Sequence, residues 1–134
     1  MCLTIKSEIC PSELVKDGKI ECYKFAKVRE NKLFAPFAYL YEYSVGKNLP
    51  TSFSDNISDL IKQSHGGYFT ISEGVIHAYV ENVYIPIIEE DKEVIFKCWA
   101  YAEDFVALGH NNDICFKKLY IDEEEYKKAV SFYD

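Results

Sequence analysis

The chain has 134 residues, of which 49% are apolar and 28% are charged, and its formal net charge is −7. This profile is typical of a soluble globular protein rather than a disordered segment, so we expect a single domain over residues 1–134. Nucleic-acid binding relies on lysine and arginine to neutralise phosphates, and the negative charge therefore argues against a nucleic-acid partner.

The first predicted elements lie between residues 1 and 46. Residues 1–9 favour a short first strand or an ordered arm. Residues 20–46 contain two aromatic-rich runs with the period of a strand, joined by a short polar link at residues 29–32, which is typical of an antiparallel hairpin. Pro36 cannot donate to a strand ladder, so we expect the second strand to begin after it. On that strand three tyrosines share one face: Tyr39, Tyr41 and Tyr43.

The remaining elements complete an α+β pattern. Apolar residues at helical spacing predict a short helix over Asn56 to Ser64. Further strands are predicted at 75–80, 94–101 and 114–121, and the near-continuous apolar run 94–101 predicts a strand buried on both faces. Asp122, with a glutamate three residues later, predicts a C-terminal helix. We therefore expect an α+β fold, a twisted, mainly antiparallel sheet with one short central helix and one C-terminal helix.

The five cysteines indicate the compartment. An odd number with no closely spaced CxxC pairs favours neither a disulfide framework nor a structural zinc site. The pattern predicts reduced thiols and a cytoplasmic location. The chain also contains no signal-peptide pattern and no apolar run of about 18 residues, so we expect no membrane partner.

Four short motifs occur in order along the chain: Cys22-Tyr23-Lys24, Ala35-Pro36-Phe37, Tyr41-Glu42-Tyr43 with Gly46, and Gly74 with His77 and Tyr79. This series of CYK, PF, YEYxxG and GxHxY segments resembles a loose group of short, uncharacterised proteins of bacteria and their phages. The resemblance implies an accessory protein of a phage or mobile element, with no particular reaction. The same order is also similar to ADP-ribosyltransferase-like folds, although the chain lacks that group's first-strand arginine and its Ser-Thr-Ser motif.

Catalytic and metal motifs are sparse. The three histidines lie more than ten residues apart and lack the spacing of metal ligands, so we predict no metal and no cofactor. No GxSxG, phosphate-binding loop or dinucleotide fingerprint occurs, and no catalytic residue is assigned. A pair of Cys22 with His77, or a general base at Glu42, is chemically conceivable. An enzyme of transferase or hydrolase type centred on His77 or Glu42 therefore stays an alternative.

Aromatic residues accompanied by a few cations favour binding instead. Such a surface suits a nucleotide-like ligand through stacking and charge, and it equally suits a protein hot spot. We therefore expect non-catalytic binding of a host protein or a small nucleotide-like ligand, with a homo-oligomeric structural protein as a further alternative. The candidate ligand-binding residues are Lys24, Arg29, Tyr39, Tyr41, Tyr43, His77, Tyr79 and Trp99.

Overall fold

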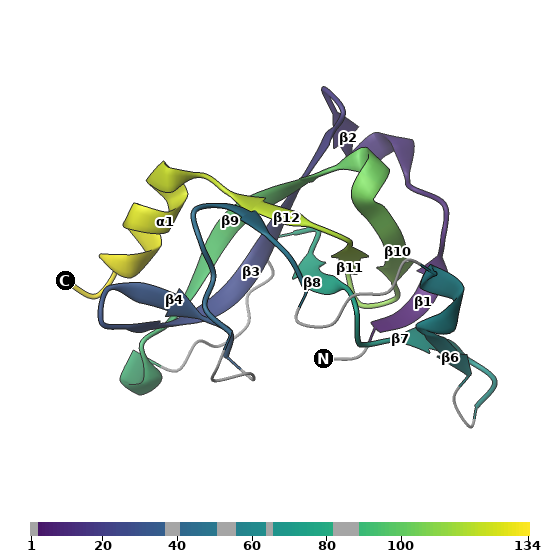
Figure 1. The fold of residues 1–134 in the computed structure, drawn as a ribbon, viewed down its shortest axis with the longest axis horizontal. Helices are drawn as coiled ribbons and strands as arrows, with labels where there is room; N and C mark the ends of the chain where they lie inside the picture. The colour runs from purple at the N-terminus through teal and green to yellow at the C-terminus, as the bar shows by residue number, and fades with distance from the viewer. Residues whose placement is uncertain (1–2, 37–40, 51–55, 64–65, 82–88) are drawn as a thin grey trace.

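The computed structural model describes residues 3–36, 41–50, 56–63, 66–81 and 89–134. Figure 1 shows the arrangement of their strands and of the single helix among them, α1 (Glu123–Val130). The strands are β1 (Leu3–Ser7), β2 (Val15–Lys16), β3 (Lys19–Arg29), β4 (Lys32–Phe34), β5 (Gly46–Asn48), β6 (Ile61–Gln63), β7 (Phe69–Ile71), β8 (Ile76–Tyr79), β9 (Glu93–Tyr101), β10 (Phe105–Gly109), β11 (Asp113–Phe116) and β12 (Leu119–Ile121). Short 3-10 turns lie at Ser12–Leu14, Ile57–Asp59, Glu89–Asp91 and Ala102–Asp104.

The twelve strands form one sheet in which every described pair is antiparallel. The order is β5-β12-β9-β3-β8-β11-β10-β1-β7-β6, with β2 and β4 paired to β3. The predicted α+β class, the mainly antiparallel sheet and the C-terminal helix are therefore confirmed. No helix among the described residues has the length and apolar character needed to cross a membrane.

Strand β3 organises the sheet because it pairs along both of its edges. One edge runs beside β9, from Lys19 opposite Tyr101 to Lys27 opposite Glu93. The other edge pairs in turn with β2, β8 and β4. Both tight hairpins that flank β3 have two central residues with positive φ, Asp17-Gly18 and Glu30-Asn31. This conformation matches the twist of the flanking strands and allows a two-residue connection.

The hairpin partner of β3 was predicted to begin after Pro36, and this position is wrong. The chain turns at Glu30-Asn31 and pairs again at once through β4, which ends before Pro36. The expected strand after Pro36 is reduced, in the described residues, to a bridge between Phe34 and Glu42 and to β5. Tyr39 lies outside the described residues.

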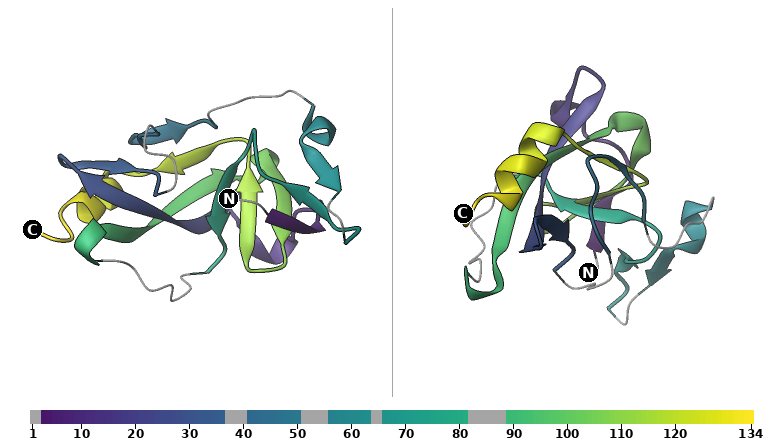
Figure 2. Two further views of the ribbon diagram at one scale, coloured as in Figure 1. Left: turned by 90° about the horizontal axis from the view of Figure 1, so that it is seen from below. Right: turned by 60° about the vertical axis from the view of Figure 1, so that its left-hand side comes forward.

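The sheet twists and curls strongly, as the two views in Figure 2 show, and its inner face surrounds the main core. Ile20, Phe96, Phe116 and Leu119, from four different strands, are almost fully buried there. Helix α1 covers one end of this core, beside β9 and β4, and adds Ala129.

A second, smaller core lies on the opposite face of β10 and β11. It contains Leu3, Ile71, Val106 and Cys115, and the 3-10 turn and strand β6 that precede β7 pack against it. Because Phe116 faces the main core and Cys115 faces the second core, β11 is buried on both sides. The sequence predicted this property for residues 94–101 instead.

Strand β9 alternates, so the expectation of burial on both faces is wrong there. Val94, Phe96, Cys98 and Ala100 are buried, whereas Tyr101 is 37% exposed and the side chain of Lys97 is 46% exposed. The two parities therefore form an inner and an outer face. The outer face of β9 carries the only tryptophan of the chain, Trp99.

The predicted central helix over Asn56 to Ser64 is also wrong within its described part. The chain forms a 3-10 turn at Ile57–Asp59 and then strand β6, while residue 64 lies outside the described residues. The Asn56 side chain accepts a hydrogen bond from the Ser58 amide, which closes a local turn. Strand β6 then pairs with β7. The apolar spacing that predicted a helix serves here to bury Ile57, Leu60 and Ile61 against the second core.

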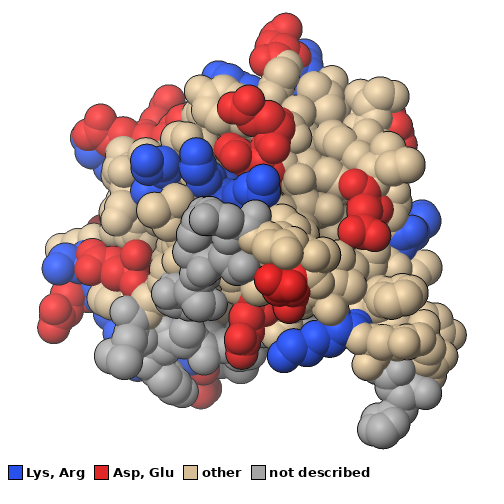
Figure 3. Space-filling model, turned by 45° about the vertical axis from the view of Figure 1, so that its right-hand side comes forward, with Lys and Arg blue, Asp and Glu red and all other residues tan. Residues whose placement is uncertain are grey.

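The predicted last strand, 114–121, is divided into β11 and β12. Residues 117 and 118 lie between them, and the two strands have different neighbours in the sheet. On the face drawn in Figure 3, acidic and basic side chains are interspersed among neutral ones. The net charge of −7 therefore does not give this face a single sign.

Candidate functional site

Lys24 is the most unusual of the predicted binding residues because it lies on the inner face of β3. Its neighbours of the same parity, Cys22 and Ala26, are completely buried. The Lys24 ammonium donates a hydrogen bond to the backbone carbonyl of His77 and lies 5.3 Å from the centroid of the Tyr43 ring. Burial lowers the pKa of Lys24, an effect opposed by the neighbouring thiols. No carboxylate of the described residues forms an ion pair with it.

Tyr43 lies beside Lys24, and Tyr41 packs against Tyr43. Tyr43 is only 4% exposed and packs edge-on against Phe96 and Tyr41. Burial raises the pKa of Tyr43 well above its ordinary value. The Tyr41 hydroxyl donates to the carbonyl of Leu49. These two rings therefore belong mainly to the packing of the fold.

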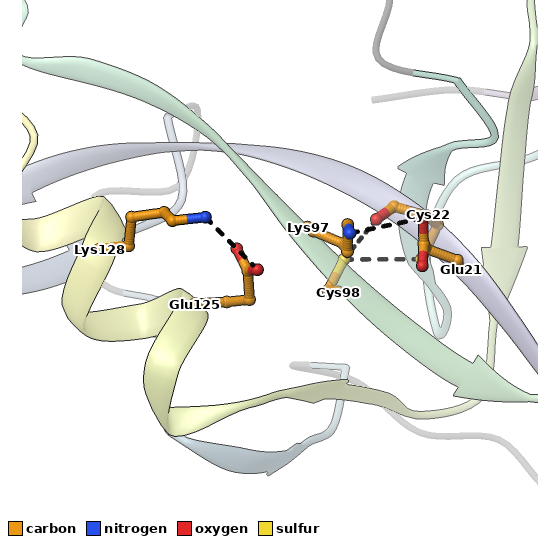
Figure 4. A network of polar contacts seen from close by, with 6 residues as sticks. All are labelled: Glu21, Cys22, Lys97, Cys98, Glu125 and Lys128. Carbon is orange, nitrogen blue, oxygen red and sulfur yellow. Dashed lines mark hydrogen bonds and ion pairs between the residues drawn. The ribbon is translucent and has the colours of Figure 1, made fainter.

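Two thiols face each other beside Lys24. Cys22 on β3 lies directly opposite Cys98 on β9 (Figure 4). Their sulfur atoms are 3.5 Å apart. The hydrogen bond with Cys98 and burial raise the pKa of Cys22 well above that of an ordinary thiol. Because a neutral thiol is a poor nucleophile, this pair is suited to packing rather than to covalent catalysis.

His77 is buried on β8, where it is the cross-strand neighbour of Cys115. Its Nε2 atom lies 2.9 Å from the carbonyl oxygen of Ser72. A carbonyl can only accept, so Nε2 carries the proton and donates it. Nδ1 is then an acceptor, and it has no hydrogen-bond partner among the described residues. Burial lowers the pKa of His77, which favours the neutral ring.

The structure does not assemble either of the conceivable catalytic groups. The His77 ring forms a hydrogen bond with the backbone carbonyl of Ser72, whereas the Cys22 thiol forms a hydrogen bond with the Cys98 thiol. Glu42 is exposed, and its Oε1 atom lies 3.9 Å from Nζ of Lys32. The described residues contain no group of three side chains suited to hold a metal ion.

Arg29 and Tyr79 lie apart from Lys24. Arg29 is exposed at the tip of the β3–β4 hairpin, opposite Lys32. Tyr79 is half-buried, pairs across strands with Tyr23 and packs edge-on against Phe25 at 5.5 Å. The predicted residues are therefore distributed over several places rather than one pocket.

Trp99 belongs to a different cluster, on the outer face of the sheet. Its ring is nearly parallel to that of Tyr120, with 4.5 Å between centroids, and meets Tyr101 edge-on at 5.0 Å. The Lys19 ammonium lies 4.4 Å from the centroid of the indole. We call this cluster of Lys19, Trp99, Tyr101 and Tyr120 the Trp99 patch.

The register of three strands builds the Trp99 patch. Tyr101 is opposite Lys19, and Tyr120 is opposite Trp99. Directly opposed residues point to the same face, so their side chains meet. The indole Nε1 donates to Asp122 Oδ1 at 3.0 Å. This bond fixes the orientation of the ring and connects the patch to the start of α1.

The two faces of the indole are both occupied within the protein. Tyr120 lies against one face, and the Lys19 ammonium therefore lies over the other, since both could not occupy the same space. A nucleobase could not stack on Trp99 without displacing one of them. The patch instead offers ring edges, the partly exposed Tyr101 and a lysine.

Sequence reasoning found Trp99 but missed Lys19, Tyr101 and Tyr120. Tyr101 could have been found, because it lies two residues after Trp99 on the same strand and so shares its face. Lys19 and Tyr120 come from distant segments, and only the register of β3 and β12 with β9 places them there.

The chain matches no protein-family model, and no curated protein or solved structure is significantly similar to it. The similarity to short bacterial and phage proteins stays a prediction from the motifs.

Proposed function

We propose that the protein is a non-catalytic binding protein that engages a protein partner through the Trp99 patch. The single observation that carries the proposal is the ordered aromatic cluster on the outer face of the sheet, held by stacking and by the hydrogen bond to Asp122. Tryptophan and tyrosine dominate protein hot spots because they bury a large area with few rotatable bonds.

Three considerations support a protein rather than a nucleotide-like ligand. The indole already has a neighbour on each face. The only arginine of the chain, Arg29, lies at the far hairpin tip, where β3 meets β4, rather than at the Lys19 end of β3. The patch lies on the outer face of neighbouring strands, whereas a small molecule prefers a concave site.

The enzyme alternative has little support in the contacts. The thiols of Cys22 and Cys115 have raised pKa values, that of Cys115 about 12 because of burial. His77 has no carboxylate or thiol among its hydrogen-bond partners in the described part of the chain. Nucleophilic catalysis needs a base within hydrogen-bond reach of the nucleophile.

A cytoplasmic accessory protein of a phage or mobile element, acting on a host protein, fits these properties. The free thiols support the compartment, since Cys22 and Cys98 face each other without a disulfide bond between them. The phage origin rests on the motif resemblance alone.

The test begins with the native protein immobilised in a lysate of its own host. A captured protein counts only if it binds again after purification. We expect Tyr101→Ser to weaken that binding about tenfold or more, as expected for a hot-spot aromatic. Tyr68→Ser is the matched control, because Tyr68 is 61% exposed beside β7, in another part of the sheet. Equal loss in both variants, or loss in neither, would contradict the proposal.

Light scattering separates the homo-oligomer alternative. A monomeric mass that persists at high protein concentration favours a different protein as the partner. A dimer that Tyr101→Ser dissociates would instead identify a second copy of the chain as the occupant of the patch.

A further inference from the structure

The lysines around the Trp99 patch indicate the charge of its partner. Lys16 on β2 is directly opposite Lys19 on β3, and Lys47 on β5 is directly opposite Tyr120 on β12. All three lysines are exposed. They therefore border the aromatic rings on the outer face, in a protein whose net charge is −7.

Two carboxylates beside the patch are already engaged within the protein. Glu21, which is opposite Trp99, lies 3.8 Å from Lys97, a pair drawn in Figure 4. Asp122 accepts the indole hydrogen bond. Within the described residues, Lys16, Lys19 and Lys47 have no carboxylate within ion-pair distance. These three lysines therefore carry positive charges that no ion pair in the described residues neutralises.

The opposition of Lys16 and Lys19 is unfavourable for folding. Like charges directly opposite each other destabilise a strand pair, whereas opposite charges contribute roughly 0.2–1 kcal/mol. The hairpin itself does not require these lysines, because its turn is fixed by Asp17-Gly18. A partner carboxylate placed between the two lysines would relieve the repulsion.

From this charge complementarity we infer that the Trp99 patch binds an acidic segment of its protein partner, with carboxylates against Lys16, Lys19 and Lys47 and apolar side chains against Tyr101 and Tyr120. The inference rests on the proposed function and adds the chemistry of the partner. Rim charges of this kind act mainly on the association rate and on specificity. They also make binding sensitive to salt, because the screening length shortens from about 10 Å at 0.1 M to about 3 Å at 1 M ionic strength.

The test uses random linear peptides displayed on phage and selected against the full-length protein at low salt. Enriched sequences are synthesised and titrated against the wild type and four variants. Lys16→Glu and Lys19→Glu reverse the border charge, and Tyr101→Ser removes an aromatic contact. Lys62→Glu is the control, because Lys62 is exposed on β6, in another part of the sheet.

The Lys16→Glu variant separates binding from folding. It replaces a like-charge pair with a pair of opposite charges, so its thermal stability should be equal to or above that of the wild type. We nevertheless expect it to weaken the affinity for the selected peptides about fivefold to tenfold, equivalent to about 1.0–1.4 kcal/mol. Loss of binding could then not be attributed to misfolding.

The outcomes distinguish this inference from the proposed function. Acidic enriched peptides that lose affinity in Lys16→Glu but not in Lys62→Glu support both. The enriched peptides could instead be neutral or basic, with an affinity that falls in Tyr101→Ser but is unchanged in Lys16→Glu. That result would overturn the charge inference and leave the proposed function intact. Absence of enrichment, or peptides indifferent to Tyr101→Ser, would count against both. Tight binding of a labelled single-stranded oligonucleotide that Lys16→Glu abolishes would replace the acidic segment with a nucleic acid.

Discussion

Asp122 has two possible roles, and one double-mutant cycle separates them. It occupies the N-cap position of α1, but its side chain makes no capping hydrogen bond and instead accepts from the indole of Trp99 at 3.0 Å. The structure thus makes Asp122 a bridge between the Trp99 patch and the helix. The perturbations are Asp122→Ala, Trp99→Phe and the two together.

The expected magnitude follows from this geometry. The hydrogen bond is exposed and has one charged partner, so Asp122→Ala should lower the free energy of unfolding by about 1 kcal/mol. Loss of an N-cap would also cost about 1 kcal/mol, so the single variant does not distinguish the two roles. In the Trp99→Phe background the indole donor is already absent, and Asp122→Ala should then cost roughly 0–0.3 kcal/mol.

The assay is urea denaturation followed by far-ultraviolet circular dichroism, because Trp99→Phe removes the only tryptophan. A coupling energy of about 1 kcal/mol between the two sites supports the bridge. If Asp122→Ala costs the same in both backgrounds, the side chain acts as a helix cap and the reasoning about the patch is refuted.

Three further predictions concern the interior. Gly109→Ala should destabilise by about 1–3 kcal/mol in urea denaturation, because an added Cβ would lie 2.0 Å from Asp113 Oδ1; an unchanged midpoint would contradict this packing. The pKa of Lys24 is lowered in the folded state, so the unfolded chain binds more protons between that pKa and about 10.4, and wild-type stability should rise with pH in this window. Lys24→Met should lack that part of the rise, and parallel pH profiles for the two proteins would contradict its burial. Brief iodoacetamide treatment of the native protein, mapped by mass spectrometry, should leave the buried thiols unmodified until urea is added. Rapid modification of these thiols in the native protein would show that they are reactive and contradict the prediction. These thiols are Cys22, Cys98 and Cys115.

Local signals were enough to predict several elements. The polar link at residues 29–32 predicted a hairpin turn, and Glu30 and Asn31 have the positive φ angles that such a turn requires. Asp122 and the acidic residues after it predicted α1, which begins at Glu123. The alternation of β3 also placed Lys24 on the same face as Cys22 and Ala26. The small apolar residues on that face could have indicated the interior, but Lys24 was predicted to lie on a binding surface.

The errors arose where distant pairing decides the structure. Ile57, Leu60 and Ile61 have spacing that fits a helix, but pairing of β6 with β7 and burial against the second core favour a turn and a strand. Trp99 was recognised as a binding candidate, yet its neighbours in the patch come from β3 and β12. A register between segments far apart in sequence cannot be read from the period of one segment.

The most direct test of the Trp99 patch as a binding surface is fluorine NMR of protein labelled with 5-fluorotryptophan. The chain has one tryptophan, so a single resonance reports on the patch even when the partner contains tryptophan of its own. We predict that the purified partner, or a selected acidic peptide, shifts this resonance to saturation, and that Lys16→Glu and Tyr101→Ser weaken the titration while Lys62→Glu does not. A ligand that binds with full affinity while the resonance stays unchanged would place the binding surface elsewhere and contradict the account.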